Sequence, residues 1–421
     1  MRTSTAILAL VGLLAAGGLI WSARRASVPV SEDGRRVYRL AAWGGVEEIG
    51  ELQTLVVDPV NTAASGFQVR LMPIPSDYHT KLGTMVAGGS GPELFYLSHE
   101  YVAAFAEQGA LLELTDLVEA DASPATDLGD YYPSVLNQYR RGGRLYGLPW
   151  IAQPVILYCN AEMFRRAGVA LPDGSWNWAR FVQAGRALTK DADGDGRIDQ
   201  WGFVLNGWPP SRMWVWQNGA ELIDPRTGRL RLTDPRVCEA IDAYAGLIHR
   251  DRIAPPLSVV AEAGFSEMFR ARKVAMFMGG SADDLDRIEG LDVVCAEIPA
   301  GPTGIRATFA WSAGLHLSPA VADRREAFEA YRRVLDGIQR WKIPAPRKSL
   351  AARLEQFEPR KAAAASVIRA SMRYMRAPPA SARQIEFETL YREQFEDEVL
   401  RTGRRAAELA PAAANVLEKL R

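Results

Sequence analysis

An acidic loop in the middle of the chain has the residue types and spacing of a calcium-binding loop. Aspartate occupies positions 1, 3, 5 and 9 of the run 191–199, and glycine occupies position 6. Carboxylate oxygens at alternate positions can converge on one hard cation, while the glycine permits a sharp turn. Position 12 is Gly202, so the closing glutamate is missing. The loop predicts either an acidic turn without metal or a structural Ca²⁺ site made by Asp191, Asp193, Asp195, the backbone carbonyl of Arg197, and Asp199.

Several tryptophans stand beside glycine, proline, asparagine or serine, at separated points of the chain. Flat aromatic faces at loop positions suit a ligand with apolar C–H faces and a polar rim, such as a sugar. Core packing is the alternative, because tryptophan is highly buried on average. Sites gather on loops at the carboxyl ends of strands. We therefore expect pocket positions for Trp43, Trp150, Trp214, Trp216 and Trp311.

Residues for covalent or acid–base catalysis are sparse. The four histidines, at positions 79, 99, 249 and 316, have neither metal-ligand spacing nor a neighbouring nucleophile motif. The glycine-rich run 88–91 lacks the lysine of a phosphate-binding loop. We therefore expect a binding protein rather than an enzyme, with no required cofactor. An exported glycoside hydrolase is the alternative, and it would need two carboxylates at a fixed separation.

Alternating strands and helices must position these residues. We expect strands at 37–42, 67–72 and 93–97, with helices at 47–60, 77–87 and 100–108 between and after them. This order predicts an α/β fold with a parallel sheet and helices on both faces. Further strands are expected at 154–158, 274–278, 293–298 and 315–318, and further helices at 161–167, 178–188 and 237–249. After residue 324 the pattern is almost all helical, and Trp341 there receives no role.

Length and charge restrict the class of protein. A chain of 421 residues is expected to form two or more domains. Fifty basic residues balance fifty acidic ones, so nothing favours a nucleic-acid partner. The three cysteines, Cys159, Cys238 and Cys295, are too few and too widely spaced for a disulfide framework. We expect buried thiols, with one bridge as the alternative.

The first 26 residues resemble an export signal. Arg2 precedes an apolar run over 6–21, and Arg24-Arg25 follows it. The segment 1–26 is therefore a signal peptide or an uncleaved membrane anchor. Both predict an exported protein, in the periplasm or on the outer face of the cytoplasmic membrane, that meets a membrane only through this segment or a membrane partner.

The chain after residue 37 resembles the sugar-type extracellular solute-binding proteins of bacterial ABC importers. The resemblance rests on the shared order of several motifs, at 91–97, 106–116, 146–150 with 157–160, 191–203, 279–281 and 343–349. It implies a two-lobe periplasmic binding protein fold, type II-like, with a ligand cleft between lobes that close on hinge strands. The implied divisions are lobe 1 at 37–150, lobe 2 at 151–290, a lobe 1 return segment at 291–345, and C-terminal helices at 346–421, mainly in lobe 2.

The same resemblance places further ligand contacts. Glu47 lies beside Trp43 at the first strand-to-helix turn, and Tyr96 and Ser98 end the third strand. Gln153 stands where relatives often have a carboxylate, and Ser281 stands where some have a stacking aromatic. Asn218 joins Glu47 and Gln153 as a candidate hydrogen-bonding partner of sugar hydroxyls.

These implications define the expected function. The protein would bind a carbohydrate and deliver it to the permease of an ABC importer, as a monomer. A membrane-anchored sugar sensor of the same fold is the alternative within the family.

Overall fold

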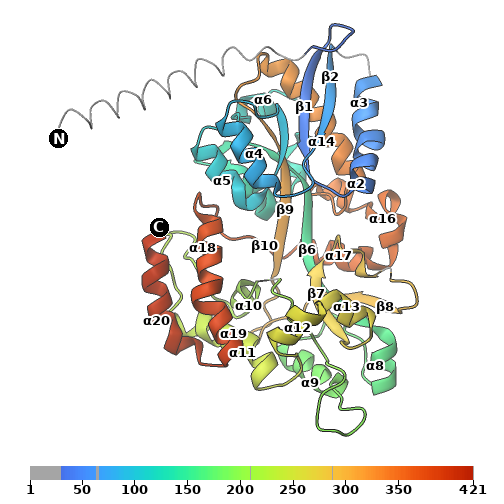
Figure 1. The fold of residues 1–421 in the computed structure, drawn as a ribbon, viewed down its shortest axis with the longest axis vertical. Helices are drawn as coiled ribbons and strands as arrows, with labels where there is room; N and C mark the ends of the chain where they lie inside the picture. Colours follow the sequence, from blue (N-terminus) through green and yellow to red (C-terminus); the bar gives the residue numbers. More distant parts are fainter. Residues whose placement is uncertain (1–29, 63–65, 209, 287, 421) are drawn as a thin grey trace, which may run out of the picture. The chain divides into compact units, whose positions relative to one another are not determined.

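The computed structural model describes residues 30–62, 66–208, 210–286 and 288–420 (Figure 1). The signal or anchor expected at 1–26 lies outside these residues. The chain divides into two compact units: unit 1 holds residues up to 131, 139–151 and 313–342, and unit 2 holds 132–138, 152–312 and 343–421. None of the described helices is both long and apolar enough to span a bilayer.

The sheet of unit 1 is built from the predicted alternation. Its elements are β1 (Arg36–Ala42), α2 (Val46–Leu52), a π-helical turn (Gln53–Val57), α3 (Asp58–Thr62), β2 (Phe67–Pro73), α4 (Tyr78–Ala87), β3 (Leu94–Ser98), α5 (His99–Glu107), α6 (Thr115–Glu119) and α14 (Arg324–Trp341). Strand β1 pairs in parallel with β2 and β3, as the sequence predicts. The helices expected at 47–60, 77–87 and 100–108 are confirmed.

Helices flank this sheet, with α4 and α5 on one side of β1 and β3, and α2, α3 and α14 on the other (Figure 1). Helix α14 packs closely on the π-helical turn. A Cβ added at Gly337 would lie only 2.8 Å from Val56 Cγ1, so a larger residue would not fit there. The fourth strand of this sheet is the second half of β9 (Thr308–Leu317), which runs antiparallel to β3. The short strands β4 (Arg140–Arg141) and β5 (Arg144–Leu145) form a separate hairpin.

Unit 2 is centred on β6 (Leu148–Asn160), which pairs antiparallel with both β7 (Met276–Gly280) and β8 (Val293–Ala296). Its helices before β9 are α7 (Pro133–Leu136), α8 (Ala161–Ala167), α9 (Trp178–Leu188), α10 (Arg212–Gln217), α11 (Pro235–His249), α12 (Leu257–Ala263) and α13 (Phe265–Arg270). The side chains of Asn160 and Asn177 cap α8 and α9 by accepting from the backbone N–H of Met163 and Arg180.

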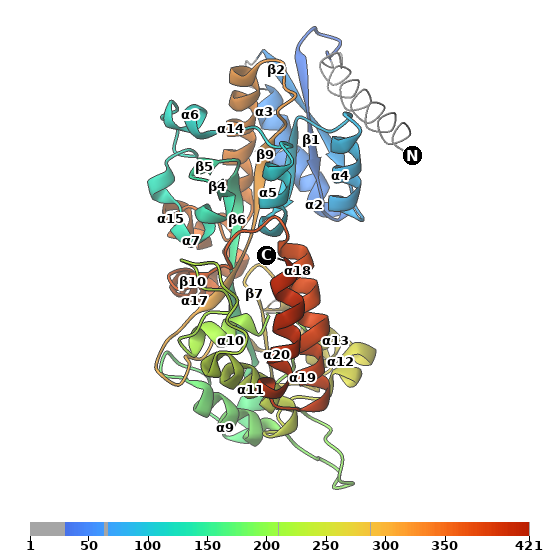
Figure 2. The ribbon, with the colours of Figure 1, turned by 90° about the vertical axis from the view of Figure 1, so that its left-hand side faces the viewer.

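The C-terminal region is mainly helical, as predicted. It contains α15 (Lys348–Ala351), α16 (Leu354–Phe357), α17 (Ala365–Met372), β10 (Met375–Arg376), α18 (Gln384–Tyr391), α19 (Asp397–Thr402) and α20 (Ala406–Leu417). Helices α18 and α20 lie side by side in both views, and α11 packs against α19 and α20 (Figures 1 and 2). Residues from these helices, including Phe387 and Leu417, complete the hydrophobic core of unit 2.

Several sequence expectations need correction. The strands expected at 154–158 and 315–318 are longer, and the one expected at 274–278 lies two residues later, at Met276–Gly280. The expected return segment 291–345 is divided: 291–312 belongs to unit 2, because β8 pairs with β6, while 313–342 belongs to unit 1, where β9 pairs with β3. Residues 132–138, expected in lobe 1, belong to unit 2.

All three cysteines are free thiols, and Cys159 and Cys238 are buried.

Candidate functional site

Three aromatic side chains of unit 1 lie close together beside its sheet. Trp43 follows β1, Tyr96 is the middle residue of β3, and Trp150 lies near the start of β6. Parallel pairing of β1 with β3 brings their carboxyl ends to one edge of the sheet. The Tyr96 ring centroid lies 4.7 Å from that of Trp150 and 5.3 Å from that of Trp43. Trp43, Tyr96 and Trp150 are called the unit 1 aromatic cluster below.

Two buried polar atoms of this cluster have no protein partner among the described residues. Tyr96 and Trp150 are only 2% and 3% exposed, and among the described residues neither the Tyr96 hydroxyl nor the Trp150 indole N–H has a hydrogen-bond partner. Leaving such a group unpaired costs about 1–3 kcal/mol. Burial raises the pKa of Tyr96 well above its usual value, and the nearby charge of Glu48 acts in the same direction. The phenol therefore stays protonated and can donate.

Helix α4 adds two residues that the sequence reasoning missed. The Tyr78 hydroxyl donates to the Ala41 carbonyl (3.0 Å) and accepts from the Tyr96 backbone N–H (3.1 Å), which ties α4 to both strands. The His79 ring stacks on Tyr101, with centroids 3.8 Å apart and planes within 4°, and its Nε2 lies 3.2 Å from Ser98 Oγ. Both residues lie in the first turn of a helix that follows a strand, and this position was the available signal.

The imidazole of His79 is neutral at physiological pH. Burial lowers the pKa of His79 to about 4, although the Glu100 carboxylate acts in the opposite direction. Its ring centroid lies 5.5 Å from that of Trp43. A neutral imidazole beside the unit 1 aromatic cluster can both donate and accept hydrogen bonds.

Glu48, rather than the predicted Glu47, is the carboxylate close to this cluster. Glu47 is exposed, whereas Glu48 is half-buried, forms a 2.6 Å ion pair with Lys342, and acts electrostatically on Tyr96. Adjacent helix residues point about 100° apart, so only one can face the cluster. Lys342 also lies 4.3 Å from the ring centroid of Trp341, whose indole N–H donates to Glu51 (3.1 Å). Trp341, which was expected to have no role, therefore contacts Lys342 of this ion pair.

The tryptophans predicted near Asn218 occupy a helix and not a loop. Residues 212–217 form α10, and Trp214 is buried in the hydrophobic core of unit 2 between Trp178 and Tyr244. The loop position predicted for Trp214 and Trp216 is therefore wrong. Asn218 and Gly219 directly follow α10 and end it. Their presence beside the tryptophans therefore indicates the end of a helix and not an exposed aromatic side chain.

Trp216 and Asn218 already have polar partners within unit 2. Trp216 is buried, donates to Glu221 (3.1 Å), and carries the Arg376 guanidinium 5.1 Å above its ring. Its ring also stacks on Phe309, with centroids 6.2 Å apart. The Asn218 amide donates to the Arg236 carbonyl (2.8 Å), so it is directed towards α11.

The remaining predicted residues of unit 2 lie on or beside its strands. Gln153 accepts from the Ala282 N–H (3.2 Å) and fills the space beside Gly280, where a Cβ would lie 2.4 Å from Gln153 Oε1. Ser281 is fully buried, and its hydroxyl has no partner among the described residues. Trp311 lies within β9, half-buried against the core. Gln153, Ser281 and Trp311 therefore stay candidate ligand contacts.

Comparison with known proteins identifies the family. The family model described as bacterial extracellular solute-binding protein matches residues 56–323. The chain belongs to this family. A binding protein of Brucella abortus (strain 2308) is 26% identical over 237 residues, which are 54% of each chain, so the present chain spans about half the length of that relative. A Deinococcus radiodurans protein whose name assigns it to ABC transport is 25% identical over 202 residues, 43% of this chain and 45% of that protein.

Solved structures agree with the fold of this solute-binding protein. The sugar-binding protein MalE of Xanthomonas citri has a TM-score of 0.78 at 20% identity, covering 91% of this chain and 97% of that one. An ABC substrate-binding protein of Listeria monocytogenes in complex with cycloalternan has a TM-score of 0.76 at 20% identity, covering 91% and 98%. The fold is thus that of the two-lobe periplasmic binding proteins. The family is described as extracellular and solute-binding.

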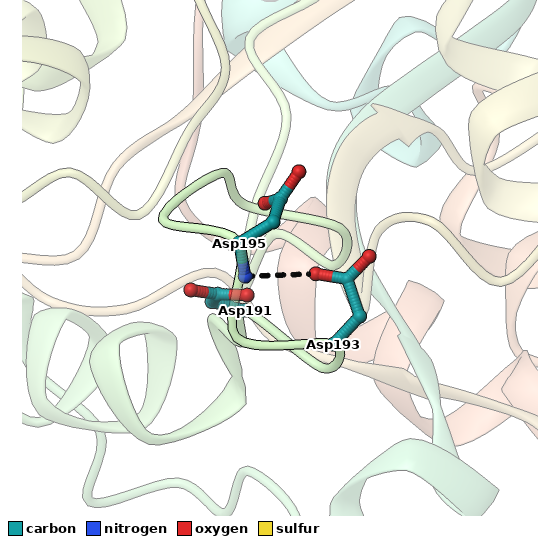
Figure 3. A group of neighbouring side chains, drawn as sticks. All are labelled: Asp191, Asp193 and Asp195. Carbon is teal, nitrogen blue, oxygen red and sulfur yellow. Dashed lines mark hydrogen bonds between the residues drawn. The ribbon is translucent and has the colours of Figure 1, made fainter.

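The acidic loop of this solute-binding protein folds as a tight turn. Carboxylate oxygens of Asp191, Asp193 and Asp195 lie within 4.8 Å of one another, and all three residues are exposed (Figure 3). Asp191 accepts from the N–H groups of Gly194 (2.7 Å) and Gly196 (2.9 Å). The Asp199 carboxylate accepts from the Ala192 N–H (2.6 Å), which closes the turn. Oxygen atoms so arranged can hold a hard cation.

Two of the histidines have structural partners. His249 Nε2 lies 2.7 Å from the Leu400 carbonyl, and His316 Nδ1 lies 2.8 Å from the Tyr146 carbonyl. Burial lowers the pKa of His316 to about 4, so this ring is neutral. His316 also leaves no room for a side chain at Gly147, where a Cβ would lie 2.4 Å from its Cε1. These positions serve packing in a solute-binding protein.

Proposed function

We propose that this solute-binding protein is the extracytoplasmic component of an ABC importer and binds a carbohydrate at the unit 1 aromatic cluster. The observation that carries the proposal is the pair of buried, unpartnered donors, the Tyr96 hydroxyl and the Trp150 indole N–H, beside the half-buried ring of Trp43. Buried donors without partners are rare in folded proteins, so a ligand that accepts from them would remove their cost.

A carbohydrate suits this combination of surfaces. Sugar rings present C–H groups that pack on aromatic faces and hydroxyl oxygens that accept hydrogen bonds. Trp43 would supply the face, and Tyr96 and Trp150 would supply the donors. Neutral His79 and the Glu48–Lys342 pair would complete a polar border without adding net charge to the site. An uncharged polyhydroxylated ligand is therefore favoured over an anion or a cation.

Three residues of unit 2 offer further groups that could bind a carbohydrate. Gln153 can offer its amide, Ser281 its unpartnered hydroxyl and Trp311 its half-buried ring. The permease of the importer would receive the ligand from this protein, which we expect to act as a monomer. Support for transport comes from the family and from relatives whose names refer to ABC transport.

Binding can be tested with purified protein and a panel of mono- and oligosaccharides, first by thermal shift and then by calorimetry. A ligand present at 100 times its Kd stabilises the native state by about 2.7 kcal/mol, which thermal shift detects readily. Binding without turnover, at one site per chain, is expected. A panel with no stabilising sugar, together with stabilisation by an unrelated solute such as a peptide, would contradict the carbohydrate proposal, and release of hydrolysis products would favour a glycoside hydrolase.

We also propose that the acidic loop holds a structural Ca²⁺. Three clustered carboxylates and the further carboxylate of Asp199 support it, while the absence of a closing glutamate at position 202 predicts weak affinity. Calcium should raise the melting temperature of the parent protein and not of Asp191→Asn/Asp193→Asn, with magnesium as the control. An equal shift in both proteins would refute the site.

A further inference from the structure

Unit 2 contains a pocket of about 650 Å³ that is separate from the unit 1 aromatic cluster. It lies between α9 and α11, and its lining residues all belong to unit 2. Sites for small organic molecules commonly have volumes of about 300–1,000 Å³. Of the predicted ligand contacts, only Trp214 lines this pocket. The residues that line it are Asn177, Trp178, Ala179, Val182, Gln183, Arg186, Trp214, Ala243, Leu247, Arg250 and Pro302.

Two indole rings contribute apolar surface to the lining of this pocket. The ring centroids of Trp178 and Trp214 lie 4.7 Å apart, with their planes tilted by 39°. The indole N–H of Trp178 donates to Gln217 (2.7 Å), so it is satisfied. The indole N–H of Trp214 is buried and has no partner among the described residues. An occupant with a flat aromatic body and an acceptor group would satisfy both features.

The border of the pocket carries an uncompensated positive charge. Arg186 and Arg250 both line it, and both bind Asp251, a side chain that is only 2% exposed. Arg250 contacts Asp251 with two nitrogens (3.2 and 2.7 Å), while Arg186 reaches one oxygen (2.6 Å). Two guanidinium groups thus share one carboxylate, which leaves a net charge of one at the border. Guanidinium groups are well suited to bind carboxylates and related oxyanions.

We propose that this pocket is a second ligand site, for a planar aromatic molecule that carries one anionic group. The aromatic body would lie against Trp178 and Trp214, and the anion would pair with Arg186. Such a ligand differs in class from the uncharged sugar proposed for unit 1. The unit 1 aromatic cluster and this pocket share no residue, so a failure of one proposal leaves the other intact. Trp214 was predicted from the sequence to contact the sugar, but the structure places it in unit 2.

The test uses the full chain and two fluorescent probes, the aromatic sulfonate 1-anilinonaphthalene-8-sulfonate and its uncharged analogue N-phenyl-1-naphthylamine. Arg186→Gln removes the excess charge but leaves the bidentate Arg250–Asp251 pair in place, so the fold is preserved. We expect this variant to weaken sulfonate binding by only about fivefold, because solvent screens the charge of the exposed Arg186. Binding of the neutral probe should be unchanged.

A second variant closes the pocket, and a third serves as the control. Ala243→Phe fills the space beside α11 and should abolish binding of both probes at this site. Arg236→Gln removes an exposed arginine of the same helix that does not line the pocket, and should leave both probes unaffected. Circular dichroism checks that each variant is folded. The proposal is overturned if Arg186→Gln and Arg236→Gln weaken sulfonate binding equally, or if folded Ala243→Phe binds both probes as the parent does.

Discussion

The aromatic clusters of the two units look alike in sequence but differ in how their polar atoms are satisfied. In unit 1, Tyr96 and Trp150 bury a hydroxyl and an indole N–H that have no partner within the part of the chain that the structure describes. In unit 2, Trp216 donates to Glu221 and carries the Arg376 guanidinium over its ring, although the indole N–H of the nearby Trp214 has no partner among the described residues. A buried polar group that the protein satisfies contributes to stability, whereas an unsatisfied one costs free energy that a bound ligand could recover. The contrast between Tyr96 and Trp150 on one side and Trp216 on the other supports our proposal that polar satisfaction, more than aromatic content, marks a candidate ligand contact.

The largest expected difference between the clusters concerns stability. Trp214→Ala removes a ring packed against Trp178, Phe181 and Tyr244 and should lower the free energy of unfolding by about 3–5 kcal/mol. Trp43→Ala removes a half-buried ring and should cost clearly less. Chemical denaturation of both variants measures this directly. Equal losses would mean that Trp43 is also a core residue, and the comparison would fail.

The second difference concerns affinity. Trp43→Ala should weaken binding of the cognate sugar by about tenfold or more, because an aromatic stacking contact is worth about 0.5–1.5 kcal/mol beyond the area that it buries. Trp216→Phe keeps an aromatic ring in unit 2 and serves as the matched control, with little change in affinity. Calorimetry gives both values. If Trp216→Phe weakened the sugar more than Trp43→Ala, the assignment of the binding surface to unit 1 would be wrong.

The unpartnered hydroxyl allows a subtler test. Tyr96→Phe removes a buried hydroxyl that has no hydrogen bond to any described residue, so the free protein should be as stable as the parent or more stable. The same change should weaken sugar binding about fivefold, since one hydrogen bond contributes about 1 kcal/mol. Thermal unfolding without ligand and calorimetry with ligand separate the two effects. A purely structural tyrosine would show lower stability and unchanged affinity.

Sequence patterns predicted the elements of unit 1 well, because its strands and helices follow clear apolar periodicities and its candidate residues stand at strand ends. Trp43 follows a strand that was predicted correctly, while the ligand contacts of Trp43 and Tyr96 stay predictions. The same reasoning misplaced Trp214, because a six-residue helix is too short to show a period. Glu48 and His79 were missed, since the facing side of a helix and the stack on Tyr101 depend on tertiary packing. Residues 291–312 and 313–342 fall in different units because their strands pair with different partners. Those partner strands lie far from them in the sequence.

The smallest expected difference concerns pH, and the two regions should respond with opposite sign. His79, beside the unit 1 aromatic cluster, has a pKa lowered to about 4 by burial, against about 6.5 when unfolded. The unfolded state therefore binds the proton more tightly, and this stability contribution is lost as the pH falls from 6.5 towards 4. Glu396, whose carboxylate accepts from the Ser211 N–H before α10, has a raised pKa because it is buried. Its contribution is present below the unfolded pKa and is lost as the pH rises through the folded value.

Unfolding free energies of His79→Gln and Glu396→Gln between pH 4 and 7 test these signs. His79→Gln should flatten the acid side of the stability profile by about 1 kcal/mol, a value reduced for the partial exposure of the ring. Glu396→Gln keeps an acceptor for Ser211 and should gain stability relative to the parent as the pH rises. If both variants changed the profile in the same direction, burial would not be the dominant cause of one of the two pKa shifts. Opposite signs would instead show that burial disfavours the charged form of both residues: His79 beside the unit 1 aromatic cluster and Glu396 in unit 2.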